Sequence, residues 1–138
     1  MKIELHEVFS VPDLAENFWK VRVLVIDEKS PAQETLTEWS KKQKTDYKKI
    51  LKALRIAAKR KDCLNPNHVK RSTNPNHGGK IFEIRAHRGH ARLMFFYSLK
   101  NESLIVCTNP YWKGKGNQNQ AFDMCAKFQQ IFENNYAL

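Results

Sequence analysis

The sequence predicts an α+β domain in which helices pack on one face of a small antiparallel sheet of about four strands. Three observations lead to this class. A Val/Ile-rich segment precedes two stretches with helical periodicity, three short apolar runs then lie close together, and a final stretch is again helical in period. The 138 residues, 41% of them hydrophobic, suffice for one domain with its own core.

The first 19 residues are expected to form an extension to a single domain that spans residues 20–138. Apolar and polar side chains alternate over residues 2–8, which is typical of a short strand. A Pro-Asp pair then starts a turn or a short helix that ends near Trp19.

The domain itself is predicted to begin with a buried strand over residues 20–27, because β-branched residues dominate there. A capping box marks the start of the next helix. Ser30 takes the N-cap, Pro31 the first helical position, and Gln33 lies three residues after the cap. This helix should end at about Lys42.

A second helix is predicted from Thr45, as its cap, to Lys61. Its apolar residues fall on one helical face and its lysines and arginines occupy the rest, so one side packs and the other presents cations. Because the joint between the two helices is short, they should form an antiparallel hairpin.

The second half of the chain opens with a break over residues 63–79, where two Asn-Pro pairs and a Gly-Gly pair predict a long loop. Three strands follow, joined by connectors short enough for hairpins, so they should form an antiparallel meander. They span residues 80–86, 91–97 and 103–109. A basic, Gly-rich and aromatic loop over residues 110–119 leads to a C-terminal helix at about 120–135.

The charge of the chain is strongly asymmetric. Lys and Arg number 24 against 14 Asp and Glu, which gives a net charge of +10. Residues 1–40 hold four basic and eight acidic side chains, whereas residues 41–92 hold 16 basic and three acidic ones. So concentrated an excess favours a polyanionic partner, with nucleic acid as the first candidate.

Other sequence features indicate the cellular compartment in which the protein resides. No apolar run approaches the roughly 18 residues that a membrane span needs, and the first nine residues lack the apolar core of a signal peptide. The three cysteines are widely spaced and form no disulfide framework. We therefore expect a cytoplasmic protein with no membrane partner.

The stretch Lys80–Tyr97, KIFEIRAHRGHARLMFFY, resembles the core of the RelE/ParE toxin superfamily, most of all its HigB-like, phage-derived branch. In that branch one strand carries an aromatic residue, Glu, an aliphatic residue and Arg, which residues 82–85 match here. The next strand opens with Arg, here Arg92, and continues apolar and aromatic. An aliphatic strand and a Lys-rich loop follow, although Gly114 splits the two lysines of this chain.

The resemblance implies the toxin of a type II toxin–antitoxin system, a ribosome-dependent mRNA endoribonuclease (mRNA interferase) that inhibits translation. Its partners would be mRNA on the ribosome and a cognate antitoxin protein. Two alternatives stay open. One is a ParE-like toxin that inhibits gyrase without catalysis, and the other is a basic nucleic-acid-binding domain without activity.

RNA cleavage of this kind needs the ribose 2′-hydroxyl to attack the adjacent phosphate, and fixed cations stabilise the charge that develops without an obligatory metal. Arg85 and Arg92 lie seven residues apart across a tight turn. They should therefore lie opposite each other on neighbouring strands and bind one phosphate together. The alternative is two solvated strand arginines.

Four further side chains are candidates for the chemistry. Lys113 and Lys115, in the glycine loop, would close over the RNA backbone, or else merely solubilise the loop. His87 and His90 are the proton-transfer candidates closest to the arginines, although exposed histidines are also common in turns. Glu83 shares the face of Arg85, where it would act as a base or pair with a cation.

The residues expected to contact RNA are basic or aromatic side chains of the second helix, the loops and the first meander strand. They are Lys48, Lys52, Arg55, Lys59, Lys70, Arg71, Lys80, Arg88, Tyr111 and Trp112. The two aromatic residues would stack on bases, with core packing as the alternative for Trp112. No cofactor and no metal is expected, because a zinc site built on Cys63, His68 and His77 lacks a fourth ligand at close spacing.

Overall fold

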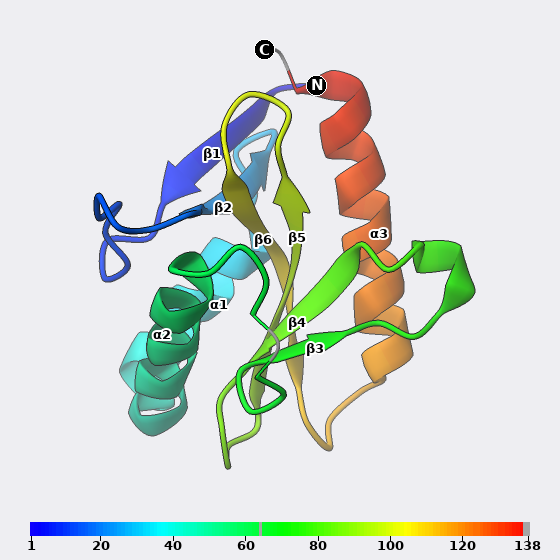
Figure 1. Cartoon of the computed structure of the whole chain (residues 1–138). Helices are drawn as coiled ribbons and strands as arrows, with labels where there is room; N and C mark the ends of the chain where they lie inside the picture. Colours follow the sequence, from blue (N-terminus) through cyan, green and yellow to red (C-terminus); the bar gives the residue numbers. More distant parts are fainter. Residues whose placement is uncertain (64, 137–138) are drawn as a thin grey trace.

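The computed structural model describes residues 1–63 and 65–136. It contains a six-stranded sheet with the order β1-β2-β6-β5-β4-β3, and helices on both sides of it (Figure 1). The strands are β1 (Ile3–Glu7), β2 (Lys20–Ile26), β3 (Val69–Arg71), β4 (Ile81–Arg85), β5 (Ala91–Ser98) and β6 (Leu104–Trp112). The helices are α1 (Pro31–Lys42), α2 (Lys44–Ala58) and α3 (Gln118–Asn135), with a short 3₁₀ helix at Pro75–His77. The predicted α+β class is confirmed.

The sheet is larger than predicted and mixed rather than antiparallel. β2 runs parallel to β6, with Lys20 opposite Leu104 and Val23 opposite Cys107. The other neighbouring strands are antiparallel, including the predicted β4-β5-β6 meander. β1 and β3 form the two edges of the sheet. β1 confirms the short strand predicted over residues 2–8, whereas β3 arises from the segment predicted as a loop.

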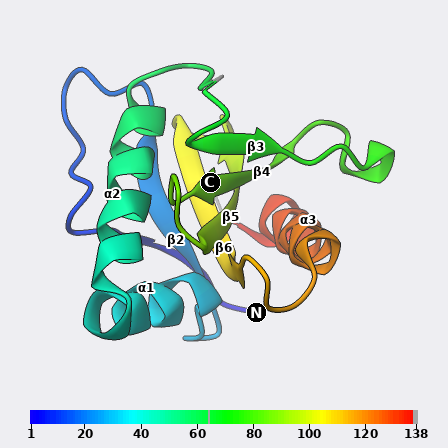
Figure 2. The same cartoon turned by 90° about the horizontal axis from the view of Figure 1, so that it is seen from below.

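The helices do not share one face of the sheet, contrary to the prediction. α1 and α2 cover one face and α3 covers the other, so the molecule has three layers (Figure 2). Leu93 and Phe95 of β5 belong to the core under α1 and α2, whereas Met94 and Phe96 belong to the core under α3. A strand covered on both faces has no polar side, which explains the unbroken apolar run of β5.

Local signals located the two helices α1 and α2 along the chain. Ser30 Oγ accepts a hydrogen bond from the backbone N–H of Gln33 at 3.1 Å, as the capping box predicts, and α1 starts at Pro31. α2 is shorter than predicted, since it ends at Ala58 rather than Lys61. Its N-cap is Gln43 instead of Thr45, and no side chain caps it.

Residues 1–19 are joined to the rest of the fold. β1 pairs with β2, placing Ile3 opposite Ile26. The segment after β1 forms turns and bends rather than a short helix, and it buries Val11 and Trp19 in the core. The indole Nε1 of Trp19 donates to the carbonyl oxygen of Arg60 at 2.8 Å, which fixes this segment to the end of α2.

The loop before α3 is shorter than predicted. β6 continues to Trp112, and α3 begins at Gln118 after the side chain of Asn117 accepts from the backbone N–H of Gln120 at 3.1 Å. Only residues 113–117 therefore connect the sheet to α3. Within residues 1–63 and 65–136, no helix combines the length and apolar character needed to cross a bilayer.

Candidate functional site

A pocket of about 520 Å³ opens at the end of the sheet where the β4–β5 turn lies. The turn forms one wall, and the loops before β3 and after β6 form the others. The pocket is lined by Pro66, Asn67, Arg85, Ala86, His87, Arg88, Gly89, His90, Arg92, Lys113 and Gly114. Five of the six side chains predicted to take part in catalysis are thus together in one pocket.

The two arginines have the predicted register, because Arg85 of β4 lies directly opposite Arg92 of β5. Arg85 leaves 29% of its side chain exposed, and its Nη1 donates to the carbonyl oxygen of Pro66 at 3.0 Å. This bond ties β4 to the loop before β3. Arg85 therefore presents a cation at the surface of the pocket while one of its nitrogens is held.

Arg92 is much more deeply buried than Arg85, with only 4% of the residue exposed. Its Nη1 donates to the carbonyl oxygens of Ala91 at 2.9 Å and Gly89 at 3.0 Å, with that of Ala86 at 3.4 Å. Burial lowers the pKa of Arg92 below its ordinary value, and the charge of Glu83 opposes that shift. Arg92 thus holds the turn in shape from beneath the pocket.

Glu83 is the carboxylate that balances the two arginines. It is fully buried, with its Oε2 3.6 Å from Nε of Arg85 and 4.0 Å from Nε of Arg92. Gln118, at the start of α3, donates its Nε2 to both carboxylate oxygens at 3.1 and 3.3 Å. The charge of this buried carboxylate is compensated by the two arginines. Glu83 therefore pairs with cations, which is the simpler of its two predicted roles.

The turn itself is fixed by Asp46 in the first turn of α2. Its Oδ2 accepts from the backbone N–H groups of His90 at 2.7 Å and Ala91 at 2.8 Å. A Cβ atom at Gly89 would lie 2.8 Å from Oδ1 of Asp46, so a side chain here would have to displace that carboxylate. Arg88 adopts a left-handed backbone with φ of 60°, which is uncommon outside glycine.

The predicted histidines of this turn both line the pocket but lie beside different aromatic rings. His87 is exposed, and its ring centroid is 6.4 Å from that of His68, which was considered only as a zinc ligand. His90 stacks on Trp112 with centroids 5.6 Å apart and ring planes within 13°. Trp112 therefore serves both as a packing residue and as a platform for a pocket side chain.

The surroundings of His68 favour the neutral form of its imidazole. Burial lowers its pKa below the usual 6.5, and the positive charges of Lys52 and His87 lower it further. Its Nδ1 is buried without a hydrogen-bond partner among the described residues. Nothing in the sequence marked His68 as a neighbour of the turn, because that proximity depends on the pairing of β3 with β4.

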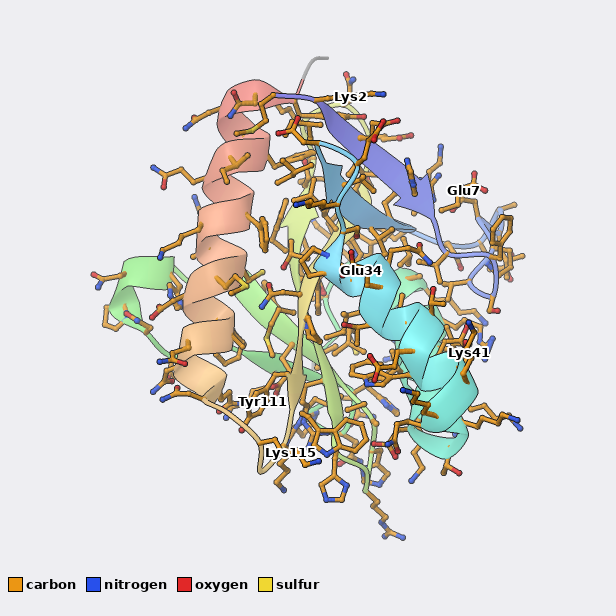
Figure 3. All side chains as sticks on the ribbon, turned by 180° about the vertical axis from the view of Figure 1, so that it is seen from behind. Lys2, Glu7, Glu34, Lys41, Tyr111 and Lys115 are labelled. Atoms are coloured by element: carbon orange, nitrogen blue, oxygen red, sulfur yellow. The ribbon has the colours of Figure 1, made fainter. Side chains whose placement is uncertain are left out.

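The glycine loop divides the two predicted lysines. Lys113 lines the pocket, and its backbone N–H donates to the carbonyl oxygen of His90 at 2.8 Å. Lys115 lies instead on a second hollow of about 400 Å³ between α1, β6 and α3, which Tyr111 also lines. Figure 3 shows Tyr111 and Lys115 at the end of the sheet beside the start of α3.

The other residues predicted to contact RNA are spread over three regions. These are α2 with its C-terminal end, the edge strand β3, and the segments that flank β4. Lys48, Lys52, Arg55 and Lys59 are exposed along α2, where Arg55 Nη1 donates to the carbonyl oxygen of Ser10 at 3.0 Å. Lys70 and Arg71 are exposed on the edge strand β3.

Lys80 and Arg88 lie at opposite ends of the β4 region. Lys80 lines a hollow near the end of β5, away from the turn, so it does not join the candidate site. Arg88 lines the pocket.

The zinc ligands considered for the long loop are engaged elsewhere or buried. His77 Nε2 lies 2.8 Å from Oδ1 of Asp123, and its Nδ1 lies 2.6 Å from Oγ of Ser72. Cys63 is buried. Among the residues that the structure describes, no group of three or more His, Cys, Asp or Glu side chains is arranged to hold a metal ion.

In comparisons with known proteins, no family model, no curated protein and no solved structure matches the chain.

Proposed function

We propose that this chain is a RelE/HigB-like toxin that cleaves mRNA on the ribosome. The pocket at the β4–β5 turn is the observation that carries the proposal. It combines the half-buried Arg85, Lys113 and two histidines in a volume that accommodates a nucleotide and its phosphate. Fixed cations and proton-transfer groups are what cleavage by a ribose 2′-hydroxyl requires.

In this reaction Arg85 and Lys113 bind the non-bridging oxygens of the scissile phosphate. One histidine of the turn accepts the 2′-hydroxyl proton as the oxygen attacks phosphorus. The bond to the 5′ oxygen breaks, and the other histidine protonates that leaving group. The products are a 2′,3′-cyclic phosphate and a 5′-hydroxyl end. One of His87 and His90 gains a proton in this step and the other loses one, so the protons balance.

Arg92 acts in this mechanism as a positioning residue rather than as a phosphate ligand. Three turn carbonyls and Glu83 surround its guanidinium, and only 4% of the residue is exposed. Its loss would let the turn move and displace the histidines. Catalysis is sensitive to such displacements, because a shift of about 1 Å can reduce rates on the order of a hundredfold.

The rest of the basic surface would hold the RNA backbone by charge. Lys52 is near the pocket, since its charge acts on His68, and Lys48 lies one turn away on the same helix. The partners would be mRNA on the ribosome and an antitoxin protein, and the site of action the cytoplasm.

One observation favours a second candidate, a nucleic-acid-binding domain without catalysis. Of the two arginines predicted to grip the phosphate, Arg92 has a guanidinium already committed to the protein, and a buried carboxylate neutralises part of their charge. Such a pocket would bind a phosphate through Arg85 and Lys113 without stabilising the further charge of a transition state.

The deciding experiment maps the 5′ ends of an mRNA translated by purified ribosomes in the presence of the chain. The proposal predicts new ends with wild type, their loss by at least a hundredfold with Arg85→Ala, and unchanged cleavage with Arg60→Ala, an exposed arginine outside the pocket. RNA binding with no new ends would favour the second candidate. Loss of DNA supercoiling by gyrase, with no RNA cleavage, would favour a ParE-like activity instead.

A further inference from the structure

β1 leaves one edge of the sheet open. It is the first strand in the order β1-β2-β6-β5-β4-β3, and its five residues make it longer than β3 at the other edge, which has three. The exposed charges of β3, Lys70 and Arg71, are both positive, so two copies of this edge would repel each other, whereas β1 carries charges of both signs. The edge of β1 is therefore the better place for another strand to pair.

The hydrogen-bonding groups on that edge follow from the pairing with β2. The backbone N–H of Asp27 donates to the carbonyl oxygen of Lys2 at 2.9 Å, so Lys2 faces β2. Residues of an antiparallel strand face their partner alternately. The N–H and C=O groups of Ile3, Leu5 and Glu7 consequently point outward, where they can pair with an added strand.

In the register about Leu5, β1 pairs with itself over its whole length and its charges are complementary. If two β1 strands meet antiparallel about Leu5, the outward groups of Ile3 meet those of Glu7 in the other copy, and Leu5 meets Leu5. Glu4 of each copy then lies opposite His6 of the other, which gives two carboxylate–imidazole contacts. Registers about Ile3 or Glu4 overlap fewer residues of β1. The register about Glu4 would also place Glu4 opposite Glu4, and like charges directly opposite are destabilising.

Apolar exposure supports the same register. Phe9 is 96% exposed and Met1 is 72% exposed, and both flank β1. Pairing about Leu5 brings the Met1 end of one strand beside the Phe9 end of the other, where thioether and ring can pack. On the α3 side of the sheet, Ile3 and Leu5 of both copies would form one apolar stripe, continuous with the core they already contact.

We propose that two copies of this chain associate through their β1 edges, antiparallel about Leu5, so that the two sheets become one. A two-fold axis through the strand pair makes both copies contribute the same residues. The interface is small, so we expect a dimer with micromolar affinity. The inference does not depend on the proposed nuclease activity, since β1 lies at the sheet edge opposite to β3 and takes no part in lining the pocket.

Cysteine cross-linking of the full chain tests the register. Cys63, Cys107 and Cys125 are buried, so an introduced thiol is the accessible one. Under mild oxidation, Leu5→Cys should form a disulfide-linked dimer at least tenfold faster than Glu4→Cys and than Lys127→Cys, an exposed control on α3. Faster linking of Glu4→Cys would refute the register, and equal rates for all three would refute the interface.

Sedimentation at micromolar to millimolar concentration tests the association itself. Wild type should show a reversible dimer. Leu5→Pro removes an outward N–H and spares the bonds to β2, so this variant should remain monomeric with an unchanged circular dichroism spectrum. A wild type that stays monomeric over this range overturns the proposal.

Charge exchange provides a second route if Leu5→Pro fails to fold. His6→Glu places a carboxylate opposite Glu4 twice in each dimer, so it should weaken association about tenfold. The double variant Glu4→His/His6→Glu restores opposite partners and should return the affinity to near wild type. An equal effect of the single and double variants would contradict the pairing of Glu4 with His6.

Discussion

Replacing Gly89 by Ala is expected to destabilise the protein, and the cause is one neighbour, Asp46. The backbone of Gly89 has no positive φ, so alanine meets no conformational penalty there. Its Cβ would, however, lie 2.8 Å from Oδ1 and 2.9 Å from Oδ2 of Asp46. Overpacking of this kind costs about 1–3 kcal/mol, because the carboxylate must move away from the N–H groups that it accepts.

Asp46→Ala removes the same carboxylate and should also be destabilising. Two backbone N–H groups, of His90 and Ala91, lose a charged acceptor at 2.7 and 2.8 Å. The loss is about 2–3 kcal/mol. For a chain of this length that lowers the melting temperature by about 7–10 °C.

The double variant separates this explanation from a general intolerance of the turn. Once Asp46 is alanine, the Cβ at position 89 has no carboxylate to displace, so Gly89→Ala should cost less than about 0.5 kcal/mol in that background. Urea unfolding of wild type, both single variants and the double variant, followed by circular dichroism, measures the coupling. Additive costs would refute the role assigned to Asp46.

Three further predictions concern buried charges and thiols. Arg92→Met should lower the free energy of unfolding by about 3 kcal/mol, because three carbonyls and Glu83 lose a buried cation. Arg85→Met should cost less, about 1–2 kcal/mol, because its side chain is partly solvated and Glu83 still has Arg92 beside it. Urea unfolding that ranks the two variants in reverse contradicts the two roles. The pKa of His68 is lowered by burial, so the unfolded chain takes up that proton first and stability falls as the pH drops below about 6.5. His68→Gln should flatten this fall in melting temperature, and an unaltered slope would argue against a buried neutral imidazole. Burial raises the pKa of Cys125 to about 12 and that of Cys107 as well, so both thiols should resist iodoacetamide at mildly alkaline pH until urea unfolds the chain, and rapid alkylation of the native protein would be inconsistent with their burial.

The sequence was a good guide where the physics is local. The start of α1 follows from Ser30 and Gln33, which contact each other within one helical turn. The register of Arg85 with Arg92 follows from the shortness of the turn between them. These features depend on residues a few positions apart, whose mutual geometry is fixed by the chain itself.

Pairing between distant segments was not predictable in the same way. β3 has only three residues within an Asn/Pro-rich stretch, and its strand conformation depends on the edge of β4. The parallel pairing of β2 with β6 joins segments more than eighty residues apart. The position of α3 on the second face was not predicted either, although the apolar side chains on both faces of β5 require cover on both sides.

The sequence predicted the cations of the site but not the residues that hold them in place. Asp46 holds the turn from a helix more than forty residues earlier in the chain, and Gln118 reaches Glu83 from α3. Burial also changed one assignment. Arg92, predicted as a partner of Arg85 on the phosphate, is held under the turn, because only tertiary packing decides which of two neighbouring arginines faces solvent.

The chemistry of the cut ends tests the central claim most directly. An mRNA incubated with purified ribosomes and the chain should yield fragments with 2′,3′-cyclic phosphate and 5′-hydroxyl ends, identified by their resistance or susceptibility to end-specific ligation. Arg85→Ala should abolish these ends while Arg60→Ala retains them. Fragments with 5′-phosphate ends, or equal cleavage by Arg85→Ala and wild type, would contradict a pocket in which Arg85 stabilises attack by the ribose hydroxyl.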